Sequence, residues 1–284
     1  MLRHAFRAMG TEVELLLDAE DSSLLTEAEA EFRRLEGIFS RFRPDSELSR
    51  LNEAGMRHIG SELLEVIELA VEAREASCGR FDPTVHDAVV AAGYDRSFEL
   101  IEDDVPVSAT APASTGGAVT IDHAAGQVAI EPGFRLDLGG IAKGWAVDRV
   151  VAVLAQAGPA LVNAGGDIAA SGRLWPIAVD APGEEITLAI DRGGVATSGR
   201  DRRTWMRDGR PQHHLIDPAT GFPAYGDVLT VTVAAASASD AEVLAKTLFL
   251  AGDSQRALSE AELGGIPAVL VTSAGDVHLA GGIR

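Results

Sequence analysis

The stretch Asp137-Leu-Gly-Gly-Ile-Ala-Lys-Gly144 places a carboxylate, two adjacent glycines and a lysine directly ahead of a helical pattern. We expect a helix to begin near Ile141, because apolar residues then recur at helical spacing: Ala142, Ala146, Val150, Val153 and Leu154. Glycines at this end let a ligand approach the backbone, and the unpaired N–H groups of the first turn favour an anion. Lys143 adds a positive charge. The stretch predicts a phosphate site at a helix N-terminus, with an ordinary glycine turn and a solvated lysine as the alternative.

Composition and charge restrict the class of partner. The chain has 284 residues, of which 46% are hydrophobic and 24% charged, as in globular proteins of one or two domains. The net charge of −19 argues against a nucleic-acid backbone or an anionic membrane, because both would be repelled over most of the surface. A phosphate-bearing ligand would need a local positive pocket. No apolar run approaches the ~18 residues that span a bilayer, so we expect no membrane insertion.

The cysteine content and the first residues bear on location. Cys78 is the only cysteine, so the chain forms no internal disulfide and suits a reducing compartment. Residues 1–9 contain neither the apolar core of a signal peptide nor a cysteine for lipidation. These features predict a cytoplasmic protein.

Alternating and helical patterns appear from the beginning of the chain. Residues 11–18 alternate and then run apolar, which predicts a first strand directly after Met9-Gly10. A helix is expected from Ser22 or Ser23 to about Phe39, because its apolar residues lie three and four apart. This mixture continues to the end of the chain and predicts an α+β or mixed α/β fold.

Glycine-rich and polar segments interrupt these patterns. Residues 161–168 are expected to form one strand interrupted by Gly165-Gly166, a pair that marks a bulge or a close approach of backbone. Residues 103–118 are rich in Ala, Ser, Thr, Pro and Gly and predict a surface loop. The loop carries no recognisable motif.

Seven short blocks stand in one order along the chain: Met9-Gly-Thr11, Phe39-Ser-Arg-Phe42 with the following Pro44 to Asn52, Gly79-Arg-Phe-Asp-Pro-Thr-Val85, Asp137 to Gly144, Leu161-Val-Asn-Ala-Gly-Gly-Asp-Ile168, Ala196-Thr-Ser-Gly199 and His214-Leu-Ile-Asp-Pro-Ala-Thr-Gly221. Together they resemble the ApbE family, the FAD:protein FMN transferases. The resemblance runs from about residue 9 to residue 250. It implies a mixed α/β, T-fold-like architecture with sheets flanked by helices, and a single flavin transferase domain over residues 1–284 with room for two lobes.

The resemblance implies a reaction in which the pyrophosphate of FAD is split, FMN is attached to a Thr or Ser of an acceptor protein, and AMP is released. An FAD pyrophosphatase, which would use water as the acceptor, is a second reading. A flavin-binding or flavin-trafficking protein without turnover is a third. The positions that match the FAD-contacting residues of the family are Met9, Phe42, Arg80, Phe81, Asp82, Asp137, Lys143 and Ile216.

The same resemblance implies Mg²⁺ at the pyrophosphate, held by the backbone carbonyl of Gly140 and the carboxylate of Glu242. The chain departs from the family pattern one helical turn later, where it has Ala245 and Lys246 instead of Asp or Thr. One interpretation is an ordinary ion pair between Glu242 and Lys246, with Ser239 and Glu242 forming a capping box. The other is that the Lys246 ammonium partly replaces the charge of the metal.

Two adjacent histidines are candidates for the base that activates the attacking hydroxyl. Imidazole has an unperturbed pKa near 6.5, and Asp217 is close enough in sequence to orient it. The family pattern favours His214, and His213 is the competing choice. Both histidines could instead be structural residues at the end of a strand.

Overall fold

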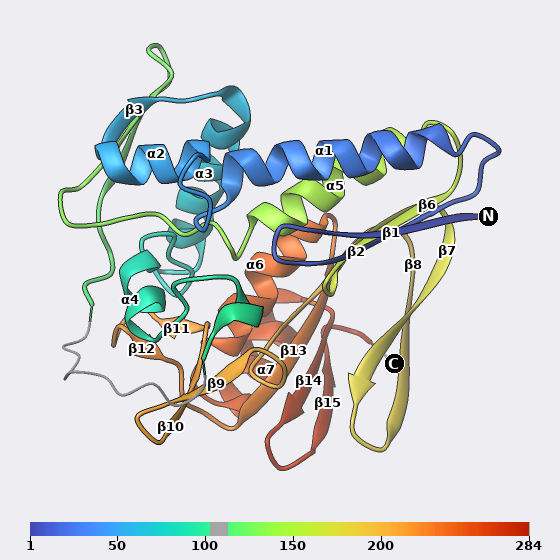
Figure 1. Cartoon of the computed structure of the whole chain (residues 1–284). Helices are drawn as coiled ribbons and strands as arrows, with labels where there is room; N and C mark the ends of the chain where they lie inside the picture. Colours follow the sequence, from blue (N-terminus) through green and yellow to red (C-terminus); the bar gives the residue numbers. More distant parts are fainter. Residues whose placement is uncertain (103–112, 284) are drawn as a thin grey trace. The chain divides into compact units, whose positions relative to one another are not determined.

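The computed structural model describes residues 1–102 and 113–283, and its ribbon is shown in Figure 1. The chain divides into two compact units. Unit 1 comprises Met1–Glu36, Gly140–Gly199 and Gly226–Arg284, and unit 2 comprises Gly37–Gly139 and Arg200–Tyr225. Of the surface loop expected over 103–118, residues 103–112 lie outside the described residues, and residues 113–118 have no regular secondary structure. The boundary at Gly139 and Gly140 falls inside the glycine-lysine stretch, so that stretch contributes to both units.

Unit 1 is built on one antiparallel sheet with the strand order β1-β2-β6-β7-β8-β13-β14-β15. In β2, Val13, Leu15 and Leu17 are completely buried while Glu12 and Glu14 are not, as expected for a strand with one face in the core. The strands are β1 (Leu2–Ala8), β2 (Thr11–Leu17), β6 (Ala160–Ala164), β7 (Asp167–Ala181), β8 (Glu184–Gly199), β13 (Val228–Ala235), β14 (Ala268–Thr272) and β15 (Val277–Ala280).

Two tight turns correct the expectations for these strands. The strand expected after Met9-Gly10 is β2, but it is the second strand, because β1 precedes it and pairs with it through a turn at Met9 (φ 52°) and Gly10 (φ 70°). The segment expected as one interrupted strand is a pair of antiparallel strands, with Gly165 (φ 67°) and Gly166 (φ 103°) in the turn between β6 and β7. A Cβ on Gly165 would lie 2.1 Å from Thr11 Oγ1, so the two turns lie against each other.

Helices α1 (Ser23–Phe39), α5 (Ala142–Leu154), α6 (Ala238–Phe249) and α7 (Ser254–Gly264) accompany this sheet. The start of α5 confirms the helix predicted near Ile141. Helices α5 and α6 pack closely at Gly144, where a Cβ would lie only 2.6 Å from the carbonyl oxygen of Ala238. The capping box expected at Ser239 is corrected: Ser237 is the N-cap residue of α6, and its side chain accepts a hydrogen bond from the N–H of Asp240.

Asp148 of α5 binds the N-terminus of α6. Its Oδ1 accepts from the N–H of Ala238 (2.7 Å), and its Oδ2 accepts from the N–H (2.9 Å) and the hydroxyl (3.0 Å) of Ser239. Burial raises the pKa of Asp148, although these hydrogen bonds favour its charged form. The carboxylate therefore supplies acceptors for N–H groups that the helix itself cannot pair.

The D148A variant is expected to lower the free energy of unfolding by about 1–3 kcal/mol, because two partly buried N–H groups lose their acceptor. Urea unfolding measures the change. The matched control is D240A, which removes an exposed carboxylate from the same helix end and should change stability by less than about 0.5–1 kcal/mol. Equal losses in the two variants would contradict the role given to Asp148.

In its described residues, unit 2 combines helices with three small groups of paired strands, β3-β5-β4, β9-β10 and β11-β12. Its aromatic core contains Tyr94, Trp205 and Ile216, packed on α4. The helix α2 was not predicted from the sequence; it is capped by Ser46 and buries Leu48 and Leu51. The elements are α2 (Glu47–Ala54), β3 (Met56–His58), α3 (Ser61–Ala76), α4 (His86–Ala91), the short 3₁₀ helix η1 (Phe98–Leu100), β4 (Val119–Asp122), β5 (Gln127–Ile130), β9 (Thr204–Arg207), β10 (Arg210–His213), β11 (Ile216–Asp217) and β12 (Phe222–Pro223).

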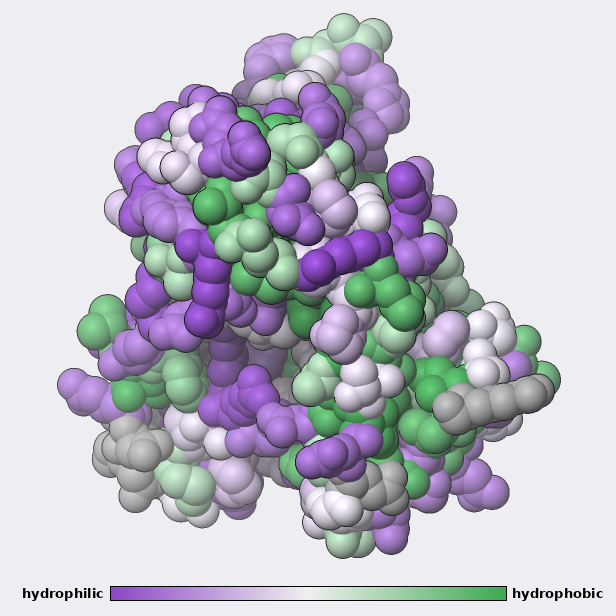
Figure 2. Space-filling view, turned by 90° about the vertical axis from the view of Figure 1, so that its right-hand side faces the viewer, coloured by the Kyte–Doolittle hydropathy of each residue, from purple (hydrophilic) through white to green (hydrophobic). Residues whose placement is uncertain are grey.

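The surface agrees with the acidic, mixed composition of the sequence. On the face drawn in Figure 2, hydrophilic residues cover much of the molecule and hydrophobic residues reach the surface in several patches between them. Within the described ranges, no helix has the length and apolar character that crossing a membrane requires.

Candidate functional site

Unit 1 places three charged side chains of the sequence motifs in one cluster. Lys143 lies in the first turn of α5, Asp167 directly follows the β6–β7 turn, and Glu242 lies in the second turn of α6. The Nζ of Lys143 is 2.5 Å from Oε1 of Glu242 and also contacts Oδ2 of Asp167. The Oε2 of Glu242 accepts from the N–H of Gly144 at 3.0 Å. The cluster therefore joins the first turn of α5 to α6 and to the sheet.

Burial strengthens the interactions between the three charged groups of this cluster. The side chains of Asp167 and Glu242 are 5% exposed and that of Lys143 is 15% exposed. Burial alone would lower the pKa of the Lys143 ammonium, but the charges of Asp167 and Glu242 outweigh it and raise that pKa above its usual value. Burial, assisted by the charge of Glu242, raises the pKa of Asp167 to about 6. Lys143 is therefore a permanently charged group, held in place by two carboxylates.

The cluster does not fit the magnesium site that the resemblance implied. Both oxygens of Glu242 already accept hydrogen bonds, from Lys143 and from the N–H of Gly144, and Asp167 also binds the Lys143 ammonium. In the described part of the chain, no three His, Cys, Asp or Glu side chains are grouped in a way that could hold a metal ion. Mg²⁺ is usually bound through one or two carboxylates together with substrate phosphates and water, and here the Lys143 ammonium already binds both carboxylates. Gly140, whose carbonyl was the other expected metal ligand, is buried in the turn before α5.

Met9, which matches an FAD-contacting position, is held near this end of the sheet. Its N–H donates to Oε1 of Glu36 at 2.8 Å. Its backbone has a left-handed conformation (φ 52°), which is uncommon for a residue with a side chain and occurs here in the β1–β2 turn. The β1–β2 turn touches Gly165 through Thr11. The sequence blocks of Met9 and Asp167, which are far apart in the chain, are therefore neighbours in the sheet.

Unit 2 contains a second group of motif residues, centred on a buried arginine. The Nε of Arg41 is 2.9 Å from Oδ2 of Asp137, and its Nη1 donates to the carbonyl oxygen of Tyr94 at 2.7 Å. Its guanidinium lies over the rings of Phe42 (4.1 Å) and Tyr94 (4.6 Å). Arg41 thus fixes Phe42 and Asp137, two of the expected FAD-contacting residues. Arg41 and Tyr94 were not predicted as site residues, and the Phe39-Ser-Arg-Phe42 block was the only signal for Arg41.

The two histidines have different environments. His213 is buried; its Nε2–H donates to the carbonyl oxygen of Ala224 (2.8 Å) and its Nδ1 accepts from the N–H of Leu215 (3.3 Å). Burial lowers the pKa of His213 to about 4, so the ring is neutral and both nitrogens serve the backbone. His214 lies edge-on to Tyr94, with ring centroids 6.2 Å apart, beside the Arg41 group. Both ring nitrogens of His213 are thus occupied by backbone groups, and the role of His214 as a base stays a prediction. Oδ1 of Asp217 accepts from the N–H of Ala219 and so closes the next turn.

Stability is expected to fall on acidification because of His213. Its pKa is about 4 in the folded chain and near 6.5 in an unfolded one, so its contribution is complete above pH 6.5 and is lost as the pH falls from there towards 4. Between a pH above 6.5 and a pH below 4, this one group lowers the free energy of unfolding by about 3 kcal/mol in total. Urea unfolding at several pH values measures this slope, and the H213Q variant should show a shallower one. An unchanged slope in H213Q would contradict this assignment.

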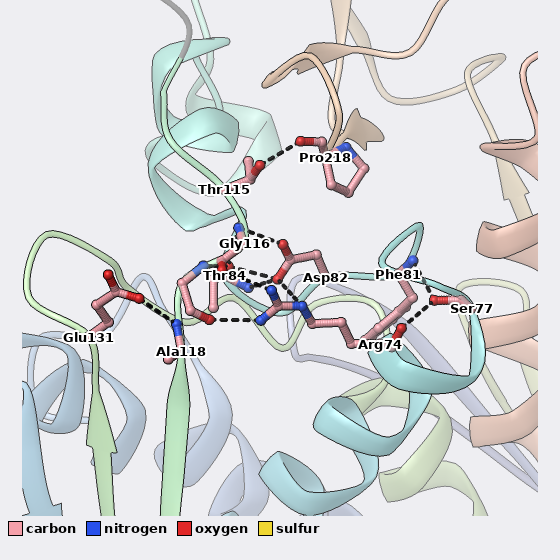
Figure 3. A network of polar contacts seen from close by, with 11 residues as sticks. Arg74, Ser77, Phe81, Asp82, Thr84, Thr115, Gly116, Ala118, Glu131 and Pro218 are labelled. Atoms are coloured by element: carbon pink, nitrogen blue, oxygen red, sulfur yellow. Dashed lines mark hydrogen bonds and ion pairs between the residues drawn. The ribbon is translucent and has the colours of Figure 1, made fainter.

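Asp82 is the centre of a polar network in unit 2 (Figure 3). Its Oδ1 accepts from the N–H (2.8 Å) and hydroxyl (2.7 Å) of Thr84, and its Oδ2 accepts from the N–H of Gly116 (2.8 Å). Arg74 donates to the carbonyl oxygens of Gly116 (2.9 Å) and Gly117 (2.7 Å). This network fastens residues 116–117 to the loop after α3 and holds Asp82 in place.

The remaining sequence candidates lie close to these groups within unit 2. The ring of Phe81 is buried, and its N–H donates to Ser77 Oγ at 2.9 Å. Arg80 is half-buried. Ile216 is buried against Trp205 and Tyr94 in the aromatic core. Contacts of these residues with FAD stay predictions.

Comparison with known proteins gives one consistent result. A family model described as the ApbE family matches residues 9–270. An FAD:protein FMN transferase of Treponema pallidum is 31% identical over 93% of this chain and 81% of its own length. An FAD:protein FMN transferase of Vibrio cholerae is 30% identical over 91% of this chain and 82% of its own length.

Solved structures are similar over almost the whole chain. The crystal structure of the ApbE protein from Thermotoga maritima has a TM-score of 0.87 at 27% identity and covers 98% of this chain and 96% of that one. The flavin transferase ApbE from Vibrio cholerae has a TM-score of 0.82 at 26% identity, again with 98% and 96% covered. These similarities confirm the mixed α/β architecture expected from the sequence blocks.

Proposed function

This chain belongs to the ApbE family, and from that membership we propose that it is an FAD:protein FMN transferase. In the proposed reaction a Thr or Ser hydroxyl of an acceptor protein attacks the phosphorus on the FMN side of the FAD pyrophosphate. The bond to the AMP oxygen breaks, FMN becomes joined to the protein through a phosphoester, and AMP leaves. The proton of the hydroxyl passes to a base. We propose that residues 1–284 act as a single flavin transferase domain.

One observation carries the proposal: a buried ammonium, Lys143, is fixed by two carboxylates in the first turn of a helix that follows two glycines. Phosphoryl transfer depends largely on positioning and on the neutralisation of charge, with little covalent chemistry for the protein to perform. A charged group with no freedom to move suits that task. We assign Lys143 to the pyrophosphate.

The base in this proposal is His214. The buried, doubly hydrogen-bonded ring of His213 leaves His214 as the neighbouring imidazole, and a general base of this kind contributes about 10²–10⁴-fold to a rate. We assign Met9, Phe42, Asp137 and Ile216 to contacts with FAD. The loop residues that we also assign to FAD binding are Arg80, Phe81 and Asp82.

The test is incubation of the purified protein with FAD, with AMP and FMN followed by chromatography. A candidate acceptor protein is added in a second arm, and covalent flavin is detected by its fluorescence after denaturing electrophoresis. Transfer is expected to give AMP and a fluorescent acceptor band. Free FMN and AMP in equal amounts without labelled acceptor would favour the pyrophosphatase reading. Tight FAD binding without AMP would favour a flavin carrier and contradict the proposal.

The compartment and the class of partner are inferred from the composition of the chain. The partners are FAD and an acceptor protein with a Thr or Ser target, and we place them in the cytoplasm because a single cysteine suits a reducing compartment. The negative net charge makes nucleic acid an unfavourable partner.

A further inference from the structure

The chain contains only two lysines, and both belong to the α5–α6 region of unit 1. Of its 24 basic residues 22 are arginines, while Lys143 and Lys246 are the lysines. Lys143 binds Asp167 and Glu242, and Lys246 lies on α6 one turn after Glu242. Wherever else this chain carries a permanent positive charge, it uses arginine. Lys143 binds both buried carboxylates, and Lys246 lies on the helix that carries one of them, Glu242.

The chemistry of the two side chains explains why a lysine is used here. An ammonium is a compact charge on a flexible stem, whereas a guanidinium is a wide planar fork that prefers two parallel hydrogen bonds. The Nζ of Lys143 fits between two carboxylates that come from different elements. If Lys246 only balanced charge on the outside of α6, an arginine would serve as it does elsewhere in the chain. Lys246 is half-buried on α6.

The charges of this cluster balance without a metal ion. Asp167 and Glu242 carry two negative charges, and Lys143 and Lys246 carry two positive ones. Residues four apart on a helix lie on the same face, so Lys246 and Glu242 project from the same side of α6. The positive charge of Lys246 also acts on Asp167, because it favours the charged form of that carboxylate. A dication would therefore meet the charges of Lys143 and Lys246 and two carboxylates that already bind Lys143.

We propose that Lys143 and Lys246 together hold the pyrophosphate of FAD and that the site uses no divalent cation. The proposal rests on the function proposed above, since it names the groups that neutralise the substrate of that reaction. Lys246 supplies the positive charge that the resemblance assigned to Mg²⁺. Lys143, fixed by its two carboxylates, supplies the other charge.

Metal binding tests this proposal without any turnover. Mn²⁺ is titrated into the purified protein, and the free ion is followed by electron paramagnetic resonance. The wild type is expected to bind no Mn²⁺ at millimolar concentration. The K246T variant, which removes the charge and adds a hydroxyl, should bind it at least about tenfold more tightly, a gain of about 1.4 kcal/mol. Stoichiometric Mn²⁺ binding by the wild type would overturn the proposal.

The presence of only two lysines allows a direct observation of both ammonium groups. Protein labelled with ζ-¹⁵N-lysine has two side-chain signals, which the K246M variant assigns. Addition of FAD is expected to shift both signals, and addition of Mg²⁺ alone should shift neither. A shift of the Lys143 signal only, or a shift caused by Mg²⁺, would overturn the proposal.

AMP release from FAD then separates this proposal from the proposed function. The wild type is expected to release AMP at the same rate, within about twofold, in EDTA and in Mg²⁺, whereas K246M should lose at least about tenfold. The K246R variant keeps the charge and tests the need for a compact ammonium. R256M removes an exposed cation of α7 and is the matched control. Release that EDTA abolishes and Mg²⁺ restores would overturn the two-lysine site alone. No release in any condition would contradict the proposed function, while the Mn²⁺ titration would still test the site.

Discussion

The K143M variant is expected to lower the free energy of unfolding by about 3–5 kcal/mol, because it leaves two buried carboxylates without their shared partner. The loss should be smaller at acid pH than at neutral pH. Without Lys143 the pKa of Asp167 rises further in the folded state, and protonation then removes its charge. Urea unfolding at several pH values measures both effects. AMP release from FAD should fall by about 10²–10³-fold or more in the same variant.

A triple variant separates stability from function at this cluster. The combination of Lys143→Met, Asp167→Asn and Glu242→Gln removes the three charges of the cluster and keeps side chains of nearly the same shape. It should recover most of the lost stability, because replacing a whole buried ionic group is far less destabilising than breaking it. It should not recover AMP release, since the ammonium is still missing. If the triple variant were as unstable as K143M, the three side chains would not form one electrostatic unit.

The H214Q variant is expected to reduce the rate of FMN transfer by about 10²–10⁴-fold through the loss of the base. The effect should fall on kcat, with FAD binding changed only a few-fold, because the imidazole acts on the attacking hydroxyl. Glutamine keeps a polar side chain of similar length beside Tyr94. Single-turnover transfer to an acceptor protein and equilibrium FAD titration give the two quantities separately.

The neighbouring histidine provides the matched control for H214Q. In H213Q, a buried ring that binds Ala224 and Leu215 is replaced. Its main effect should be on stability and its pH dependence, with kcat of the folded protein changed by less than about tenfold. A large loss of kcat in H213Q together with normal transfer by H214Q would reverse the assignment of the base.

The local sequence pattern was sufficient to predict much of the fold. The helix near Ile141 and the mixed α/β class are confirmed, because periodicity reports which face of a segment is buried. The pattern was wrong about Gly165-Gly166, which joins two antiparallel strands. Its two positive φ angles turn the chain, whereas the sequence shows only that two glycines are present. The strand β1 was missed for a similar reason: its partner β2 makes it a strand, and pairing is not visible in a single segment.

The sequence by itself determined the order of the seven blocks, their ApbE membership, and the residue types available for chemistry. Only the tertiary structure decided which of those residues act together. Lys143 meets partners 24 and 99 residues away, and Arg41 meets Asp137. It also decided that His213 is neutral and structural while His214 lies beside Tyr94. The physical reason is that charge state depends on desolvation and on neighbours within a few ångströms, and folding brings those neighbours together from distant parts of the chain.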